Sequence, residues 1–186
     1  MINNFFFKCV TLFGLGNISK IPGTLASLVT SIFFYLLLLF GNIVGNWYSK
    51  ENIIIFYIIF LFFSYFAIEK SKNFFKEKDA KEIVIDEVCG QSLPFITLIL
   101  YINMIPDLTN KSDIAIYAQA LKNLNIHFYA ILSFFLFRFF DILKPFPISY
   151  FDKNFKNSFG ILFDDILAGI AASLIILIPL IFAWLE

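Results

Sequence analysis

Long apolar runs constrain this chain more than any other feature. A helix needs roughly 20 apolar residues to cross the hydrocarbon core of a bilayer. Five runs approach that length, and they are about Thr24–Val44, Asn52–Ile68, Val88–Ile105, Ile126–Leu143 and Ile161–Trp184. With 60% hydrophobic residues among 186, the chain has more apolar side chains than a soluble core of this size buries. The sequence therefore predicts an all-α integral membrane bundle of about five apolar helices, forming a single domain over residues 1–186.

Some segments of this bundle are less regular. The third run contains Pro94, where we expect a kink, and the fifth contains Pro179 near its end. Residues 3–16 are apolar but too short to span, so we expect an interfacial or re-entrant element there. The start, MINNFFFKCV, has no basic region before its apolar stretch and no cleavage site, so it does not predict a signal peptide. Residues 107–125 read as an outer loop with a short helix.

The loops differ in their content of lysine. Glu69–Glu82 carries five Lys and Lys144–Gly160 carries three, whereas Gly41–Glu51 has one and Pro106–Asn125 has two. Lys and Arg accumulate on the cytoplasmic side of membrane proteins. We therefore expect a multi-pass protein of the bacterial inner membrane, with its N-terminus inside and its C-terminus outside. The net charge of zero gives no indication of a nucleic-acid partner.

Charged residues at the ends of the last two runs are functional candidates, because charges in apolar surroundings are costly. Arg138, Asp141 and Lys144 follow an i, i+3, i+6 spacing, so one side of a helix can carry all three. Asp164 and Asp165 are adjacent in GILFDDILAGI and diverge by about 100°, so they can hold different partners. The alternatives are an internal Arg138–Asp141 salt bridge with Lys144 reaching the headgroups, and simple helix capping by the two acids.

Two further polar clusters are expected on the same, cytoplasmic, face. Asp86 and Glu87 open the third run, as ligands or as capping acids, and Gly90 next to them permits close helix packing. In FGLGNISKIPGTLAS, the residues Gly14, Gly16, Pro22 and Gly23 indicate a tight turn. Thr24 and the amides after that turn can receive an anion, or Thr24 can be a plain N-cap. Lys20 is either a phosphate contact or a lysine of the positive-inside pattern.

Five acids and several cations are thus expected where lipid headgroups lie. Cys9 and Cys89 imply no disulfide or zinc site, Cys89 reads as a packing residue, and His127 falls at the opposite end. Oxygen ligands without His or Cys select Mg²⁺, Mn²⁺ or Ca²⁺ over zinc. Carboxylates holding Mg²⁺ beside Arg and Lys favour phosphoryl chemistry on a lipid, with hydrolysis and transfer both open. The alternative from another class is a cation transporter or channel subunit that uses the acids as an ion site.

Three blocks resemble a known family. FRFFDILKPFPISYFDKNFKNSFGILFDDILAGI is similar to the C-terminal signature of phosphatidylglycerophosphatase A, which has F-R-x-x-D-x-x-K-P-x-P-I followed by an aspartate pair and Ala-Gly. IDEVCGQ resembles its Asp-Glu-hydrophobic-x-Gly block, and FGLGNISKIPGTLASL resembles its G-x-G…PGT-x-G-S-L block, with Ala26 in place of the usual Gly. The resemblance implies a membrane-embedded phosphatase that removes the terminal phosphate of phosphatidylglycerophosphate, with Mg²⁺, to give phosphatidylglycerol.

Site residues are carried over position by position. The expected catalytic residues are Asp86, Glu87, Asp141, Asp164 and Asp165. The expected metal ligands are Glu87, Asp141, Asp164 and Asp165, and the expected substrate-binding residues are Gly23, Thr24, Arg138 and Lys144, to which we add Lys20. The attacking group is either a water activated by the metal or one of the carboxylates, and Asp86 is an acid or base candidate. The sequence leaves open the number of metal ions, the acyl-chain strictness and the oligomeric state.

Overall fold

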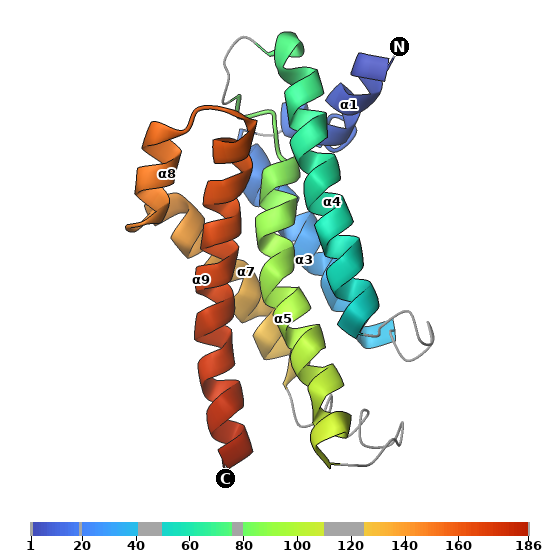
Figure 1. The fold of residues 1–186 in the computed structure, drawn as a ribbon, viewed down its shortest axis with the longest axis vertical. Coiled ribbons are helices and arrows are strands. Elements are labelled where there is room, and N and C mark those ends of the chain that lie inside the picture. Colours follow the sequence, from blue (N-terminus) through green and yellow to red (C-terminus); the bar gives the residue numbers. More distant parts are fainter. Residues whose placement is uncertain (1, 19, 41–49, 76–79, 110–124, 186) are drawn as a thin grey trace.

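The computed structural model describes residues 2–18, 20–40, 50–75, 80–109 and 125–185, and within them every regular element is helical (Figure 1). In chain order the elements are α1 (Ile2–Val10), α2 (Leu15–Ile18), α3 (Pro22–Phe40), α4 (Lys50–Ser71), the 3₁₀ turn η3 (Lys72–Phe74), α5 (Ile85–Thr109), α7 (Ile126–Leu143), α8 (Ile148–Asn154) and α9 (Ser158–Leu185). Five of them, α3, α4, α5, α7 and α9, are long and apolar enough to cross a membrane. The predicted all-α membrane bundle is confirmed.

Helices α4, α5 and α9 extend beyond the predicted runs at both ends, and α5, for example, ends at Thr109, whereas the predicted run ends at Ile105. Helix α5 begins at Ile85 and α9 at Ser158, each three residues before the apolar run expected there, so Asp86 and Glu87 fall in the first turn of α5. Helix α5 continues as one helix through Pro94, and α9 continues through Pro179. A proline is tolerated in a membrane helix where neighbouring groups satisfy the freed carbonyl. Most of the expected outer loop 107–125 and the end of the first run, 41–44, lie outside the described residues.

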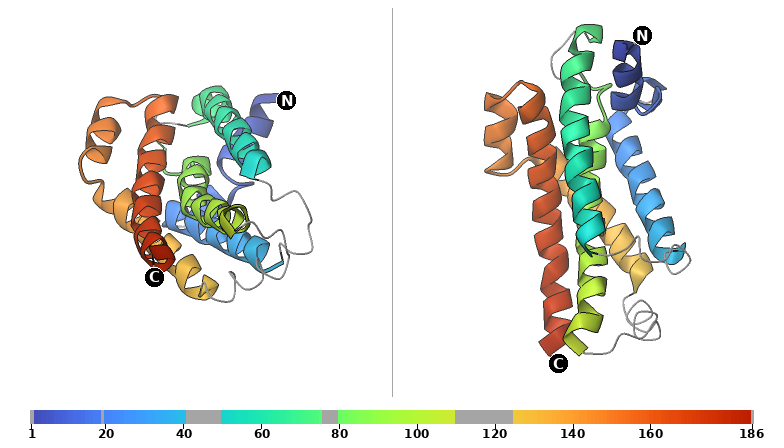
Figure 2. Two further views of the ribbon diagram at one scale, coloured as in Figure 1. Left: turned by 60° about the horizontal axis from the view of Figure 1, so that its bottom comes forward. Right: turned by 45° about the vertical axis from the view of Figure 1, so that its right-hand side comes forward.

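Helix α5 lies at the centre of the bundle, in contact with α3, α4, α7 and α9 (Figures 1 and 2). Its buried face forms much of the apolar core, with Phe95, Leu98, Ile99 and Ile102 each 1% exposed or less. Side chains of α3, α7 and α9 pack around these residues. The central position of α5 explains why its two acids, Asp86 and Glu87, can meet side chains from several other helices.

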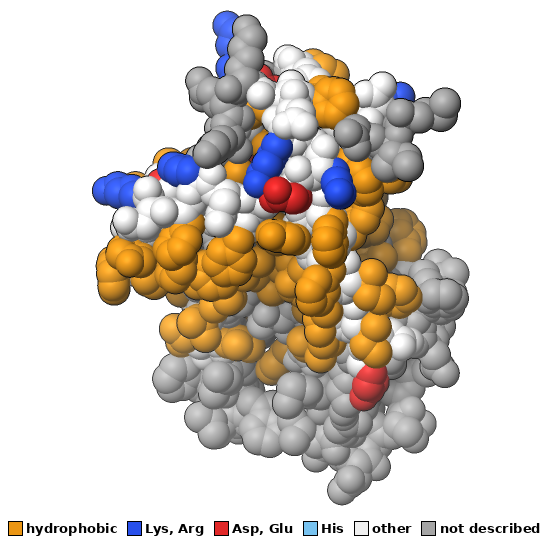
Figure 3. All heavy atoms as spheres, turned by 45° about the horizontal axis from the view of Figure 1, so that its top comes forward, with side chains coloured by type: hydrophobic (Ala, Val, Ile, Leu, Met, Phe, Trp, Pro, Cys, Tyr) orange, Lys and Arg blue, Asp and Glu red, His pale blue; other side chains and the backbone are white. Residues whose placement is uncertain are grey.

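The outer helices present apolar side chains to their surroundings. Phe33 on α3, Phe62 on α4, Phe135 on α7 and Leu174 on α9 are each 59–64% exposed. Figure 3 shows hydrophobic side chains forming a band beside a zone that carries lysine and acidic groups. So extensive an apolar surface is typical of lipid contact and marks the lysine-bearing zone as the headgroup level.

The N-terminal element packs at one end of the bundle, beside the last turns of α4 (Figure 2). The Phe7 ring lies 5.3 Å from that of Phe74, and the Val84 amide donates to the Val10 carbonyl at 2.9 Å. Helices α1 and α2 are joined by a turn in which Gly14 has φ +99°, a conformation that suits glycine. This short helical hairpin occupies the segment for which an interfacial or re-entrant element is predicted.

Candidate active site

Four helix ends meet at one end of the bundle: the starts of α3, α5 and α9 and the end of α7 (Figure 1). Each of these ends belongs to one of the polar sequence blocks. The structure therefore brings together side chains that are up to 142 residues apart in the chain, from Gly23 to Asp165. This arrangement agrees with the expectation that the polar blocks lie together at one end of the bundle.

Three carboxylates form the centre of the site. Asp86 and Glu87 in the first turn of α5 and Asp165 of α9 each place an oxygen within 4.8 Å of the others. Asp86 and Asp165 are 8% and 5% exposed. Asp86 Oδ1 and Glu87 Oε2 are buried without a hydrogen-bond partner among the described residues. Two like charges 4 Å apart repel by about 4 kcal/mol at an effective dielectric constant near 20. The group therefore fits a cation held by oxygen ligands.

Two glycines allow the helices that carry these acids to approach closely. A Cβ at Gly90 of α5 would lie 2.5 Å from the Asp165 carbonyl oxygen and 2.5 Å from the Phe137 ring. A Cβ at Gly169 of α9 would in turn collide with the Gly90 carbonyl oxygen. Small residues at a helix crossing let backbones meet in this way. The crossing holds Asp165 next to the acids of α5.

The basic side of the site comes from α7. Arg138 Nη1 pairs with Asp141, one turn further along the same helix, and lies 3.5 Å from the Ser27 hydroxyl of α3. The Arg138–Asp141 salt bridge, which the sequence gives as an alternative, is thus present. The pair lines one pocket together with Glu87, which places it beside the carboxylate group.

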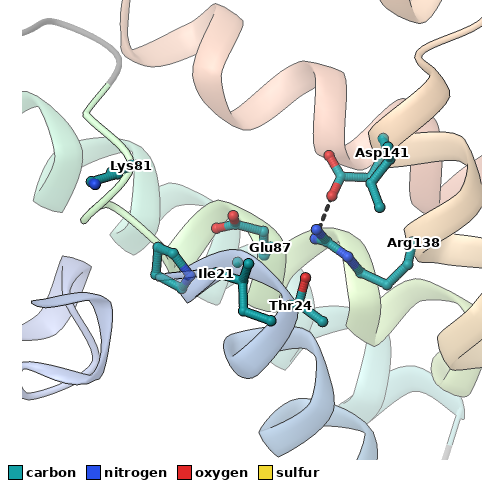
Figure 4. A pocket seen from close by; sticks show the side chains of 9 residues that line it. Ile21, Thr24, Lys81, Glu87, Arg138 and Asp141 are labelled. Atoms are coloured by element: carbon teal, nitrogen blue, oxygen red, sulfur yellow. Dashed lines mark hydrogen bonds and ion pairs between the residues drawn. The ribbon is translucent and has the colours of Figure 1, made fainter. Parts of the chain in front are cut away.

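An open pocket of about 290 Å³ lies beside these residues (Figure 4). Its walls are formed by Ile21, Pro22, Gly23, Thr24, Lys81, Glu87, Arg138, Asp141 and Ile142. Gly23 faces the interior, because a Cβ there would collide with Glu87 Oε1 and lie 3.4 Å from Arg138 Nη1. Three of the predicted substrate-binding residues, Gly23, Thr24 and Arg138, therefore share one pocket with two of the predicted metal ligands.

Lys144 is paired with two carboxylates and does not extend to the headgroups on its own, so only this part of the alternative is wrong. Its Nζ donates to Asp164 Oδ2 at 2.5 Å and to Asp152 Oδ1 at 2.8 Å. Lys144 follows the last residue of α7 with φ +42°, in the left-handed conformation that ends many helices. Burial acts to lower the pKa of Lys144, but the hydrogen bonds to the two carboxylates raise it above its usual value. Asp164 and Asp165 thus hold different partners, as their divergence predicts.

Two capping interpretations are wrong because the helices begin earlier than the sequence indicates. Helix α9 begins at Ser158, so Asp164 and Asp165 lie beyond its first turn. Helix α3 begins at Pro22, since a proline is well suited to the first helical position, where no amide is needed. Gly23 and Thr24 are consequently inside the first turn of α3, and Thr24 is not its N-cap. Asp86 and Glu87 do lie in a first turn, so the helix dipole contributes to their placement.

The remaining candidates fall in different places. Lys20 is exposed and does not line the pocket, whereas Lys81, which the sequence offers only as one of several loop lysines, does. Asp152 of α8 is a second residue that sequence reasoning missed. Cys89 is fully buried with its Sγ 3.3 Å from the Ser64 hydroxyl, in agreement with a packing role. His127 Nδ1 lies 2.7 Å from the Tyr35 hydroxyl, at the start of α7 and so far from the acids.

The sequence was compared with protein families and with known proteins, and the matches are to lipid phosphatases. The family model described as phosphatidylglycerophosphatase A matches residues 8–180. The chain belongs to the phosphatidylglycerophosphatase A family. It is therefore a lipid phosphatase, and its five apolar helices make it a membrane protein.

Three relatives show how far the family likeness extends. A phosphatidylglycerophosphatase A of Haemophilus influenzae is 32% identical over 88% of this chain and 82% of its own length. A Bacteroides thetaiotaomicron protein, provisionally named a phosphatidylinositol-3-phosphatase, is 30% identical over 89% of this chain and 87% of its own. The phosphatidylglycerophosphatase A of Escherichia coli K12 is 44% identical over 22% of this chain and 24% of its own. No solved structure matches the chain.

Proposed function

We propose that the chain hydrolyses phosphatidylglycerophosphate to phosphatidylglycerol and phosphate, with Mg²⁺, at the cytoplasmic leaflet of a bacterial inner membrane. The whole chain then acts as one membrane-embedded phosphatase domain. The observation that carries this proposal is the trio of buried Asp86, half-buried Glu87 and buried Asp165, beside a pocket that Arg138 lines. The charges gather at one end of the bundle, as a headgroup enzyme requires, and family membership favours an enzyme over a cation transporter.

The donor set fits Mg²⁺. It consists of carboxylate oxygens, and two of them are buried without a hydrogen-bond partner among the described residues. Glu87 and Asp165 belong to both the predicted ligand set and the observed trio, and Asp86 completes the trio in addition to its predicted acid or base role. The other two predicted ligands are not part of the trio. Asp141 is paired with Arg138, and Asp164 is paired with Lys144. When bound, Mg²⁺ supplies positive charge against the phosphate and its transition state.

The other residues position and stabilise the phosphate. Asp141 fixes the guanidinium of Arg138 at the pocket wall, where its remaining N–H groups can donate to phosphate oxygens. The absence of a side chain at Gly23 leaves room for the phosphate next to Glu87, and Thr24 supplies a hydroxyl in the same wall. Lys144 acts through Asp164, whose orientation it holds. Such donors, fixed before the reaction, stabilise developing charge at little cost in reorganisation.

The distribution of lysines supports a cytoplasmic site. The described residues near the site end include the exposed lysines Lys70, Lys81, Lys153 and Lys156, on α4, on the turn before α5 and on or after α8. Lys and Arg near the ends of membrane helices mark the cytoplasmic side. With five spans, the C-terminus then lies on the opposite side of the membrane.

The test is phosphate release from defined lipids in detergent micelles. The names of the two long-matching relatives point to two substrates, phosphatidylglycerophosphate and phosphatidylinositol 3-phosphate. We expect Mg²⁺-dependent release from the first, at a kcat/KM at least tenfold above the second, and none with EDTA. Hydrolysis that persists in EDTA would remove the proposed metal, and preference for the inositol lipid would replace the proposed substrate.

A further inference from the structure

Lys81 is a cation at the pocket that neither the family blocks nor the proposed reaction uses. It lines the pocket together with Glu87, Arg138 and Thr24. In Figure 4, Glu87 lies between Lys81 on one side and the Arg138–Asp141 pair on the other. The pocket therefore has a basic residue on each side of its central carboxylate.

The backbone that carries Lys81 is held firmly. Its neighbours Ala80, Ile83 and Val84 are 8%, 3% and 0% exposed, and Lys81 itself is exposed. The Ile83 amide donates to the Ala80 carbonyl, and the Val84 amide donates to the Val10 carbonyl, each at 2.9 Å. Because this turn is packed against the N-terminal hairpin, the backbone at Lys81 is held beside the pocket that its side chain lines.

Arg138 and Lys81 differ in whether a carboxylate is paired with them. Arg138 is paired with Asp141 and lies beside the buried acids, so it belongs to the deep end of the pocket. None of the ion pairs among the described residues involves Lys81. Ile21 and Ile142 also line the pocket and are 64% and 66% exposed. The pocket thus changes from carboxylates and Arg138 inside to Lys81 and apolar side chains at its mouth.

This gradient matches the order of groups in a headgroup that carries two phosphates. A volume of about 290 Å³ is at the lower limit of small-molecule sites, so it suits a headgroup and not a whole diacyl lipid. With a terminal phosphomonoester at the acids, the phosphodiester that leads to the acyl chains lies nearer the mouth. Apolar side chains at the mouth are suitable neighbours for the start of the acyl chains.

We propose that Lys81 forms a second anion subsite, which binds the phosphodiester of the lipid substrate. The inference rests on the proposed function, because it takes the deep end of the pocket as the place of the terminal phosphate. Lys81 is a specificity-determining residue under this proposal: it favours phosphomonoesters carried on a phosphodiester lipid. It takes no part in the bond-breaking step.

The test compares Lys81→Gln with wild type in mixed micelles. We expect KM for phosphatidylglycerophosphate to rise about threefold to fivefold, as for loss of one partly exposed ion pair, with kcat within about twofold. Competitive inhibition by phosphatidylglycerol, which has only the phosphodiester, should weaken by the same factor. Inhibition by inorganic phosphate, which reports on the terminal subsite, should not change. Lys81→Arg should retain the wild-type KM, since the charge is kept.

Lys70→Gln is the matched control, because Lys70 is exposed at the end of α4 and does not line the pocket. An unchanged KM and phosphatidylglycerol inhibition in Lys81→Gln would overturn the proposal. Equal weakening of inorganic phosphate inhibition would also overturn it, since Lys81 would then act on the terminal phosphate. An equal effect of Lys70→Gln would assign the change to the general charge of the surface. Failure of wild type to hydrolyse the lipid would instead reject the proposed function itself.

Discussion

Replacing Gly90 with alanine tests how the crossing of α5 and α9 sets the site. The added Cβ would lie 2.5 Å from the Asp165 carbonyl oxygen, so the helices must separate by about 0.9 Å to reach an ordinary contact of 3.4 Å. The Phe137 ring, fully buried, blocks the other direction. Overpacking of this kind costs about 1–3 kcal/mol of stability. A misplacement of about 1 Å in a catalytic group lowers activity on the order of 100-fold.

The assay for Gly90→Ala is kcat/KM for phosphatidylglycerophosphate over a Mg²⁺ titration, with thermal unfolding measured in the same detergent. Ile176→Ala is the control, because Ile176 is a fully buried core residue of α9, more than two turns beyond Asp165. The cavity left by this substitution should lower the free energy of unfolding by about 2–5 kcal/mol. The protein that remains folded should have wild-type activity. If Gly90→Ala has the same kcat/KM and the same Mg²⁺ dependence as wild type, the crossing of α5 and α9 does not position Asp165.

Three further predictions concern the side chains around the acids. Gly23→Ala places a methyl group against Glu87 Oε1, so kcat/KM should fall at least tenfold in steady-state assays, whereas an unchanged value would show that Glu87 moves aside freely. Asp164→Asn should abolish most activity and lower the free energy of unfolding by about 1–3 kcal/mol, because Lys144 loses a charged partner; retained activity in folded protein would contradict this. Burial would raise the pKa of Asp152, but its pairs with Lys144 and Lys156 lower it below the ordinary value. Its contribution to stability is therefore present above pH about 4 and lost as the pH falls through the folded-state pKa, so thermal unfolding of Asp152→Asn should be less acid-sensitive than wild type.

The sequence predicts the bundle well because span length and local spacing are properties of single helices. The run 126–143 matches α7 at both ends, and the i, i+3 spacing of Arg138 and Asp141 gives the salt bridge that the structure shows. The divergence of Asp164 and Asp165 follows from the pitch of one helix, and each does meet a different partner. These features need no knowledge of how the helices pack.

The features that the sequence misses depend on contacts between helices. Asp152 gains its importance only because α8 folds back beside α9 and meets Lys144. Lys81 is one of five lysines in its loop, and only the packing of its turn against the N-terminal hairpin places it at the pocket. The starts of α3 and α9 lie before the predicted ones, since hydropathy marks the apolar part of a helix and not the Pro, Gly, Thr or Ser in its first turn.

Carboxylates from α5 and α9 should hold one divalent cation together. Binding of Mn²⁺ to the purified protein, followed by electron paramagnetic resonance and displaced by Mg²⁺, tests it directly. Wild type should bind Mn²⁺ and release it to Mg²⁺, and Asp165→Asn should bind at least tenfold more weakly while it remains folded. Equal Mn²⁺ affinity in the two proteins would contradict the account, because the trio would then not be the cation site.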